Sequence, residues 1–172
     1  MDGGMKALPI TWKRLVKDGE TCQRCESTQQ SVLGAMTKLE AALRPLDIQP
    51  TLETQLMDDA SFRAEPSESN RIWIGGRPME EWLGASVGMS TCCSVCGSLP
   101  CRTMQVGGDT YEAIPEDLIV RAAMIAASAM IGAPPATSAS PASHWSDDGR
   151  GLPSSWASVS RSSTRDWMRV VC

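Results

Sequence analysis

Two cysteines, Cys22 and Cys25, form a Cys-x-x-Cys pair in front of a stretch with helical periodicity. A thiolate at a helix N-terminus is stabilised by unpaired backbone N–H groups and by the helix dipole. Arg24 adds a positive charge between the two thiols. The pair is typical of thiol–disulfide exchange, in which Cys22, as the more exposed thiol, attacks and Cys25 resolves the mixed disulfide. The same geometry also suits a clamp for a soft metal ion.

A second group of thiols places four cysteines within ten residues, at Cys92, Cys93, Cys96 and Cys101. Four thiolates can close a tetrahedral zinc site, although such sites usually draw two CxxC pairs from separated segments. A three-thiolate site for a thiophilic ion, such as arsenite, mercury or copper(I), fits the spacing at least as well. The remaining interpretations are a relay that exchanges with a Cys22–Cys25 disulfide, and free cysteines with no shared role.

The part of the chain that carries these thiols contains no histidine, because the single histidine, His144, follows it in a segment rich in Ser, Pro and Ala. A Cys–His nucleophile–base pair and a Cys/His zinc site are therefore excluded there. The two Gly-Gly pairs, at residues 75–76 and 107–108, are typical of hairpin turns. Neither opens a helix as a phosphate-binding loop does, so nucleotide binding has no support.

The formal net charge is −4, with no basic stripe, which argues against nucleic acid or an anionic membrane as a partner. The first residues lack the apolar segment of a signal peptide. The most apolar run, residues 118–133, is broken by Arg121 and is shorter than the roughly 20 residues of a membrane-spanning helix. We therefore expect a cytoplasmic protein whose thiols are kept reduced.

Hydrophobic periodicity predicts a small α/β sandwich with a mixed sheet, an extra hairpin and a Cys-rich loop over residues 90–101. Period-two alternation and turn residues predict strands over residues 8–17, 47–57, 71–74, 101–106 and 110–114. Helical periodicity predicts helices over residues 22–44 and 115–131. Thr21, or Ser27 with Gln30, is expected to cap the first helix.

The predicted domain covers residues 8–131. Residues 132–172 are rich in Ser, Pro and Ala, have no sustained period, and are expected to form a disordered, low-complexity tail.

Four segments together resemble a prokaryotic family that is classed as a domain of unknown function in the thioredoxin-like superfamily. They are residues 19–25 (GETCQRC), 69–78 (SNRIWIGGRP), 92–93 (CC) and 110–116 (TYEAIPE). The resemblance covers about residues 8–131 and implies a thioredoxin-like sandwich with the first thiol pair at the head of the first helix. It implies no established activity. Working thioredoxins carry a cis-proline facing the thiols, whereas the corresponding place here, residues 69–71, has none, which leaves room for a metal.

We therefore expect a thiol protein in which Cys22, Cys25 and Arg24 carry out thiol–disulfide exchange or reduction on a protein or a small thiol, without a cofactor. The alternative is a non-enzymatic protein that binds a soft metal or metalloid ion, such as arsenic, mercury or copper, through both cysteine groups. A structural zinc loop formed by the second group is a third possibility.

Overall fold

The structure, a computed structural model, describes residues 4–92 and 96–132. These residues fall within one unit of the chain, Met1–Ala133. The predicted tail, residues 132–172, lies outside the described residues except for Gly132.

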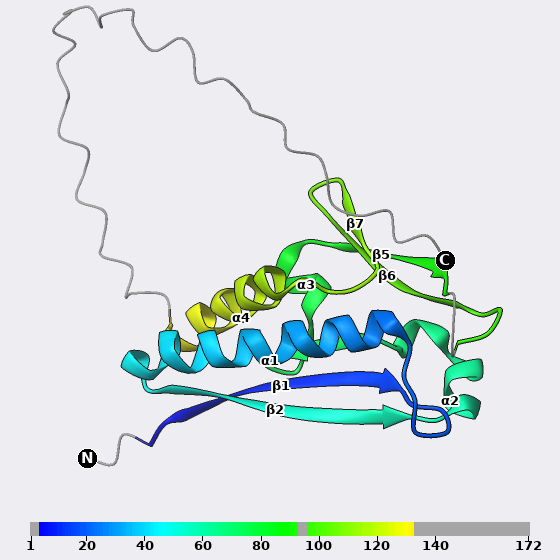
Figure 1. Cartoon of the computed structure of the whole chain (residues 1–172). Coiled ribbons are helices and arrows are strands. Elements are labelled where there is room, and N and C mark those ends of the chain that lie inside the picture. Colours follow the sequence, from blue (N-terminus) through cyan, green and yellow to red (C-terminus); the bar gives the residue numbers. More distant parts are fainter. Residues whose placement is uncertain (1–3, 93–95, 133–172) are drawn as a thin grey trace, which may run out of the picture. The chain divides into compact units, whose positions relative to one another are not determined.

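A four-stranded mixed sheet carries the site and has the strand order β2-β1-β3-β4. β1 (Lys6–Leu15) pairs in parallel with β2 (Ile48–Met57) and antiparallel with β3 (Arg71–Ile74). β3 turns back through Gly75-Gly76 into the short β4 (Arg77–Pro78), as the hairpin signal predicted. The predicted mixed sheet and its β-α-β unit are confirmed (Figure 1).

β1 is an inner strand whose apolar residues alternate with more exposed ones, so that Leu8, Ile10 and Trp12 are buried in the core. The strand begins and ends two residues earlier than predicted. Its end is set by the turn that follows it, in which Lys17 pairs with Glu20. β2 lies at the sheet edge. Pro50 lies inside β2. It is tolerated there because, at the edge of a sheet, its missing N–H need not remove a hydrogen bond between strands.

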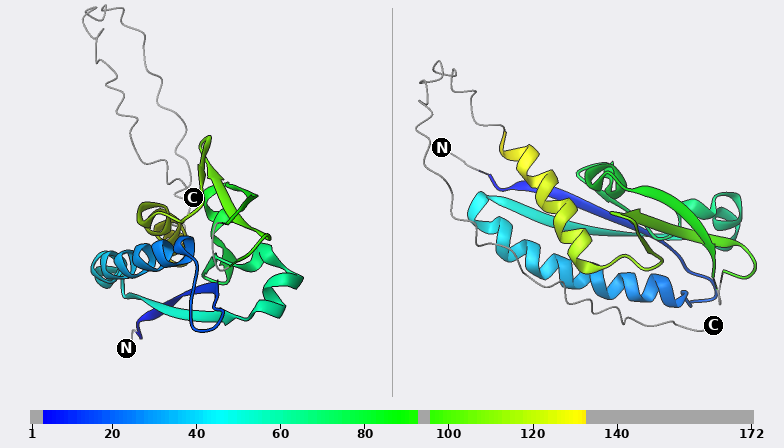
Figure 2. Two further views of the ribbon diagram at one scale, coloured as in Figure 1. Left: turned by 45° about the vertical axis from the view of Figure 1, so that its right-hand side comes forward. Right: turned by 90° about the horizontal axis from the view of Figure 1, so that it is seen from above.

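Two long helices, α1 (Gln23–Leu43) and α4 (Glu116–Ile131), cover the same face of this sheet (Figures 1 and 2). Thr28 of α1 is completely buried, and its hydroxyl accepts a hydrogen bond of 3.0 Å from the backbone N–H of Ile114. This bond fixes the segment that leads into α4 against the first turns of α1. None of the helices that the structure describes has the length and hydropathy needed to cross a membrane.

A second, three-stranded antiparallel sheet has the order β5-β6-β7. β6 (Pro100–Val106) and β7 (Asp109–Tyr111) form the predicted hairpin, whereas β5 (Ser86–Thr91) was not predicted, and its last two residues were assigned to the Cys-rich loop. Gly88 in its middle has weak β-propensity, and none of the six residues is buried. β5 forms because it pairs with β6, and the sequence of β5 alone does not reveal that pairing.

Four short helical segments connect the longer elements: η1 (Arg44–Leu46), α2 (Asp59–Ala64), η2 (Pro66–Glu68) and α3 (Met79–Leu83). Arg102 of β6 is buried and ties η2 and α3 to the second sheet. Its guanidinium donates to the carbonyl of Ser67 at 3.1 Å and to Glu80 Oε1 at 2.5 Å. Because the arginine sits next to Cys101, this ion pair also fixes the strand that carries a candidate thiol.

Candidate functional site

Cys22 is the N-cap residue of α1, with an extended backbone, so the helix presents the thiol pair at its N-terminus as predicted. The predicted caps are wrong: no side chain caps this end of the helix. The Thr21 hydroxyl instead donates to the Leu15 carbonyl at 2.8 Å and fixes the loop between β1 and α1.

The five cysteines that the structure describes converge on one buried cluster. The Sγ atoms of Cys22, Cys92 and Cys96 all lie within 4.8 Å of one another. The Sγ of Cys101 lies 2.9 Å from that of Cys96, and none of the five forms a disulfide. Cys25 is the fifth thiol, one turn into α1. The structure thus brings together the first pair and three members of the second group; Cys93 lies outside the described residues.

All five thiols are nearly inaccessible. Cys22 and Cys25 are each 1% exposed, which corrects the expectation that Cys22 is the more exposed of the pair. The three from the second group, Cys92, Cys96 and Cys101, are at most 6% exposed. The cause is the second sheet, which covers the start of α1 and which the sequence pattern did not place there.

Cys25 faces the segment in front of β3. Its Sγ lies 4.0 Å from the hydroxyl of Ser69, which is itself buried. The next residue, Asn70, has a left-handed backbone (φ 60°), and its side-chain oxygen accepts a hydrogen bond of 3.2 Å from the Trp12 indole. The segment at residues 69–71 therefore lies against the thiols, as the sequence suggested. It presents the Ser69 hydroxyl to them in place of a proline.

Contacts within the cluster lower the pKa of one thiol and raise the pKa of three others. Hydrogen bonds from Cys101, Cys25 and Cys96, joined by the backbone N–H of Cys25, hold the pKa of Cys22 far below its usual range. The pKa of Cys25 is raised, first by its hydrogen bond to Cys22 and then by burial. The pKa values of Cys96 and Cys101 are also raised, chiefly by their hydrogen bonds to neighbouring sulfurs. Hydrogen bonds within the cluster thus favour ionisation at Cys22 and disfavour it at Cys25, Cys96 and Cys101.

Arg24 does not turn toward the sulfurs. Its guanidinium donates to the Ser90 hydroxyl at 2.8 Å and to the Thr91 carbonyl at 2.7 Å, and it pairs with Glu112 at 2.7 Å. The Ser90 hydroxyl in turn donates to Glu112 at 2.9 Å. Sequence reasoning missed Ser90 and Glu112 as neighbours of the site, because no periodicity or motif links them to residue 24.

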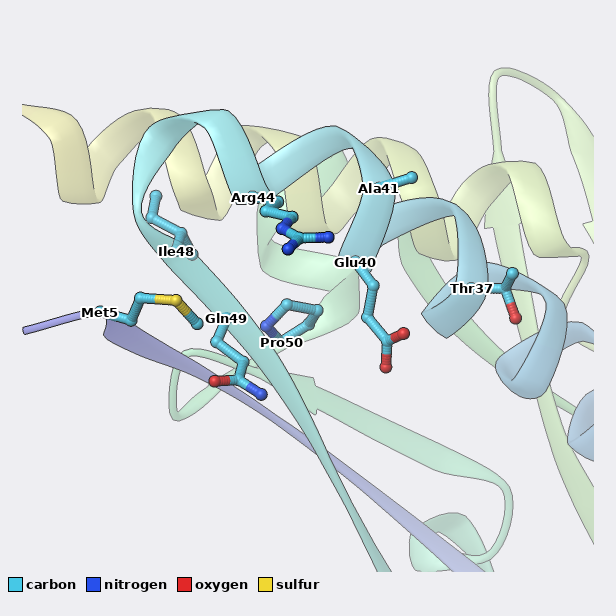
Figure 3. Close-up of a pocket in the computed structure, with 8 residues that line it drawn as sticks. All are labelled: Met5, Thr37, Glu40, Ala41, Arg44, Ile48, Gln49 and Pro50. Atoms are coloured by element: carbon cyan, nitrogen blue, oxygen red, sulfur yellow. The ribbon is translucent and has the colours of Figure 1, made fainter.

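A small pocket of about 170 Å³ reaches the cluster at Cys96. Its remaining lining comes from α2, the loop after β1 and the residues after Cys96: Lys17, Asp59, Arg63, Gly97, Ser98 and Leu99. A larger cavity of about 490 Å³ lies far along α1, between its C-terminal half and the start of β2 (Figure 3). No cysteine lines it. This larger cavity and the thiol cluster therefore occupy different parts of the described structure.

Comparison with known proteins extends over the part of the chain that holds this cluster. Residues 8–123 match the family described as "Domain of unknown function (DUF2703)". A relative from Archaeoglobus fulgidus, named "Uncharacterized protein", is 38% identical over 112 residues, which make up 65% of this chain and 82% of the relative. No solved structure matches the chain. The chain belongs to the DUF2703 family.

Proposed function

We propose that this protein binds a thiophilic metal or metalloid ion through the thiolates of Cys22, Cys92 and Cys96. The observation that carries the proposal is the convergence of these three sulfurs within 4.8 Å, from two segments far apart in the chain. In a three-thiolate site with metal–sulfur bonds of about 2.3 Å, neighbouring sulfurs lie about 4.0 Å apart. The three side chains therefore need only small shifts to meet around one ion.

The chemistry of the donor set supports a soft ion. Thiolates select soft ions such as copper(I), zinc and related thiophilic species over hard cations. Three buried thiolates without a cation would repel one another, and in the ion-free protein the pKa of Cys96 is raised while that of Cys22 is lowered. Binding then replaces thiol protons with the ion. With arsenous acid, three thiols and As(OH)₃ would form As(SR)₃ and three waters, with no change in oxidation state.

Burial favours ion binding over exchange with a large disulfide. A thiolate attacks a disulfide only if the incoming sulfur can reach it. Cys22 and Cys25 are each 1% exposed, and the pocket of about 170 Å³ beside the cluster is lined by Cys96 but by neither of them. A small ion can pass where a disulfide-bonded protein cannot.

Thiol–disulfide exchange is the second candidate, and the position of Cys22 favours it. A thiolate at the N-cap, with a lowered pKa and a second thiol one turn away, is suited to attack and resolution. The balanced reaction would convert one substrate disulfide into two thiols while Cys22 and Cys25 form a disulfide. This proposal includes the thioredoxin-like arrangement, supported by the parallel β1-α1-β2 unit, and a cytoplasmic location where thiols stay reduced.

The test is an anaerobic titration of the fully reduced protein with arsenite, copper(I) and zinc, counting the thiols that each ion protects from a thiol reagent. We expect one ion per chain and three protected thiols for arsenite. Four protected thiols with zinc, including Cys101, would instead indicate a tetrahedral site. If none of the three ions protects any thiol, while the protein reduces a small disulfide in a Cys22-dependent manner, the redox function replaces the proposal.

A further inference from the structure

We propose that Arg24 is a positioning residue that holds Cys92 against Cys22 and so completes the three-thiolate site. The inference rests on the proposed ion binding for its purpose, but the contact itself is independent of any ion. It assigns to Arg24 a mechanical role in place of the electrostatic one that its position in the CxxC pair suggests.

The guanidinium joins two segments that each carry a sulfur of the cluster. Arg24 is the second helical residue of α1, between Cys22 and Cys25. Its two terminal nitrogens reach the last residues of β5, at 2.8 Å from the Ser90 hydroxyl and 2.7 Å from the Thr91 carbonyl. Thr91 directly precedes Cys92. The arginine therefore fixes the backbone from which the Cys92 side chain projects.

Glu112 also contacts Arg24 and Ser90, and its carboxylate neutralises the charge of the arginine. Its carboxylate pairs with Arg24 at 2.7 Å and accepts the Ser90 hydroxyl at 2.9 Å. The arginine side chain is only 13% exposed, whereas that of Glu112 is 53% exposed. Hydrogen bonds that involve ionised groups are stronger than those between neutral groups. A planar guanidinium can bond several acceptors at once, whereas the ammonium of a lysine is a point charge on a flexible stem. The geometry thus requires an arginine in particular.

The end of β5 has no comparable second anchor to α1 among the described contacts. β5 is otherwise paired only with β6, in the register Ser90 with Cys101 and Thr91 with Pro100. β6 keeps its own attachment through Arg102 to Ser67 and Glu80. Loss of the Arg24 contact would therefore leave the second sheet in place but free the segment at Cys92 to move away from Cys22.

The first test measures ion affinity in the full-length chain with arsenite as the probe. For Arg24→Gln we expect a loss of about 10- to 100-fold, the range typical of residues that orient metal ligands. Arg24→Lys should lose nearly as much, because it keeps the charge but not the fork. Arg77→Gln is the matched control: Arg77 pairs with Glu81 at 3.2 Å on the surface, and its variant should bind as the wild type does. Wild-type affinity in Arg24→Gln, or full rescue by Arg24→Lys, would overturn the proposal.

The second test needs no ion. In a chain that retains only Cys22 and Cys92, with the other cysteines changed to serine, oxidised glutathione should form the Cys22–Cys92 disulfide. Each of the two steps releases one glutathione, so the two protein thiols are oxidised and glutathione disulfide is reduced. We expect Arg24→Gln to slow ring closure about tenfold, and an unchanged rate would contradict the inference.

The two tests separate the possible failures. If the wild type binds no ion but Arg24→Gln slows closure, the proposed function fails and the positioning role stands. If Arg24→Gln binds arsenite like the wild type, the positioning role fails and the proposed function stands. Urea unfolding of each variant identifies a loss caused by global destabilisation. If the two-cysteine chain does not fold, the arsenite affinities of the Arg24 and Arg77 variants in the full-length chain still test the positioning role.

Discussion

The two ends of helix α1 differ in what surrounds them. Its N-terminal end meets five buried cysteines and the Arg24–Glu112 ion pair, and a pocket of about 170 Å³ lies beside Cys96. Its C-terminal end borders the larger cavity of about 490 Å³, which no cysteine lines. Large volume is a common guide to ligand sites. Here the cysteines lie away from the larger cavity, where side chains from separate elements pack sulfur against sulfur.

We expect the largest effect at the N-terminal end of α1, on removal of the Cys22 sulfur. In Cys22→Ser, arsenite affinity should fall by about 100-fold or more, because a hydroxyl is a far poorer ligand for a soft ion than a thiolate. The measurement is the titration used for the wild type, with thiol protection as the readout.

Cys101→Ser is the matched comparison within the cluster. Cys101 contacts Cys96 but is not one of the three sulfurs that lie within 4.8 Å of one another, so its loss should change arsenite affinity by only a few fold. Equal losses in the two variants would contradict a three-thiolate site and favour a four-thiolate one.

Thr28→Val tests whether packing along α1 supports the thiol end. The change keeps the shape of the side chain but leaves the buried N–H of Ile114 without its acceptor at 3.0 Å. We expect the free energy of unfolding to fall by about 1–3 kcal/mol, measured by urea denaturation. Thr28→Ser, which retains the hydroxyl, should lose less; a larger loss there would show that the methyl group, and not the hydrogen bond, matters.

In the ion-free, reduced protein, the free energy of unfolding should depend on pH through the cysteines at the N-terminal end of α1. Folding raises the pKa of Cys25, Cys96 and Cys101, whereas thiols in the unfolded chain ionise near pH 8.5. Their contribution to stability is therefore complete below about pH 8.5 and is lost as the pH rises above it. The lowered pKa of Cys22 acts in the opposite sense: its contribution is present above about pH 8.5 and is lost as the pH falls.

Urea unfolding from neutral pH to about pH 10 measures this balance. With three raised thiols against one lowered, we expect the free energy of unfolding to decrease on the alkaline side. A variant with serine at positions 25, 96 and 101 should lose that decrease. Stability that rises steadily to about pH 10 in the wild type would contradict the predicted balance.

The smallest effect is expected at the other end of α1. Glu40→Gln and Arg44→Gln alter charged residues that line the larger cavity (Figure 3). Arsenite affinity should stay within about twofold of the wild type, and stability within roughly 0.5 kcal/mol, as is usual for surface substitutions. A large loss of ion binding in either variant would show that the two ends are coupled.

Much of the local structure followed from the sequence. The helix predicted over residues 22–44 forms as Gln23–Leu43, and the apolar run after Pro115 forms α4. The strands of the first sheet and β6 also form close to their predicted limits, whereas β7 ends at Tyr111, three residues before the predicted end at Ile114. Periodicity reports which face of an element is buried, and that property is largely local. β5 escaped prediction because its small, exposed residues show no such pattern.

The candidate site was predictable only in its parts. The spacing of Cys22 and Cys25 before a helical stretch was enough to place a thiol at the N-terminus of α1, because a helix start is read from adjacent residues. Only the tertiary structure decided that Cys92 and Cys96 join Cys22, that all of them are buried, and that Arg24 points to β5. These facts depend on how the second sheet packs over the start of α1, a contact between residues far apart in the chain.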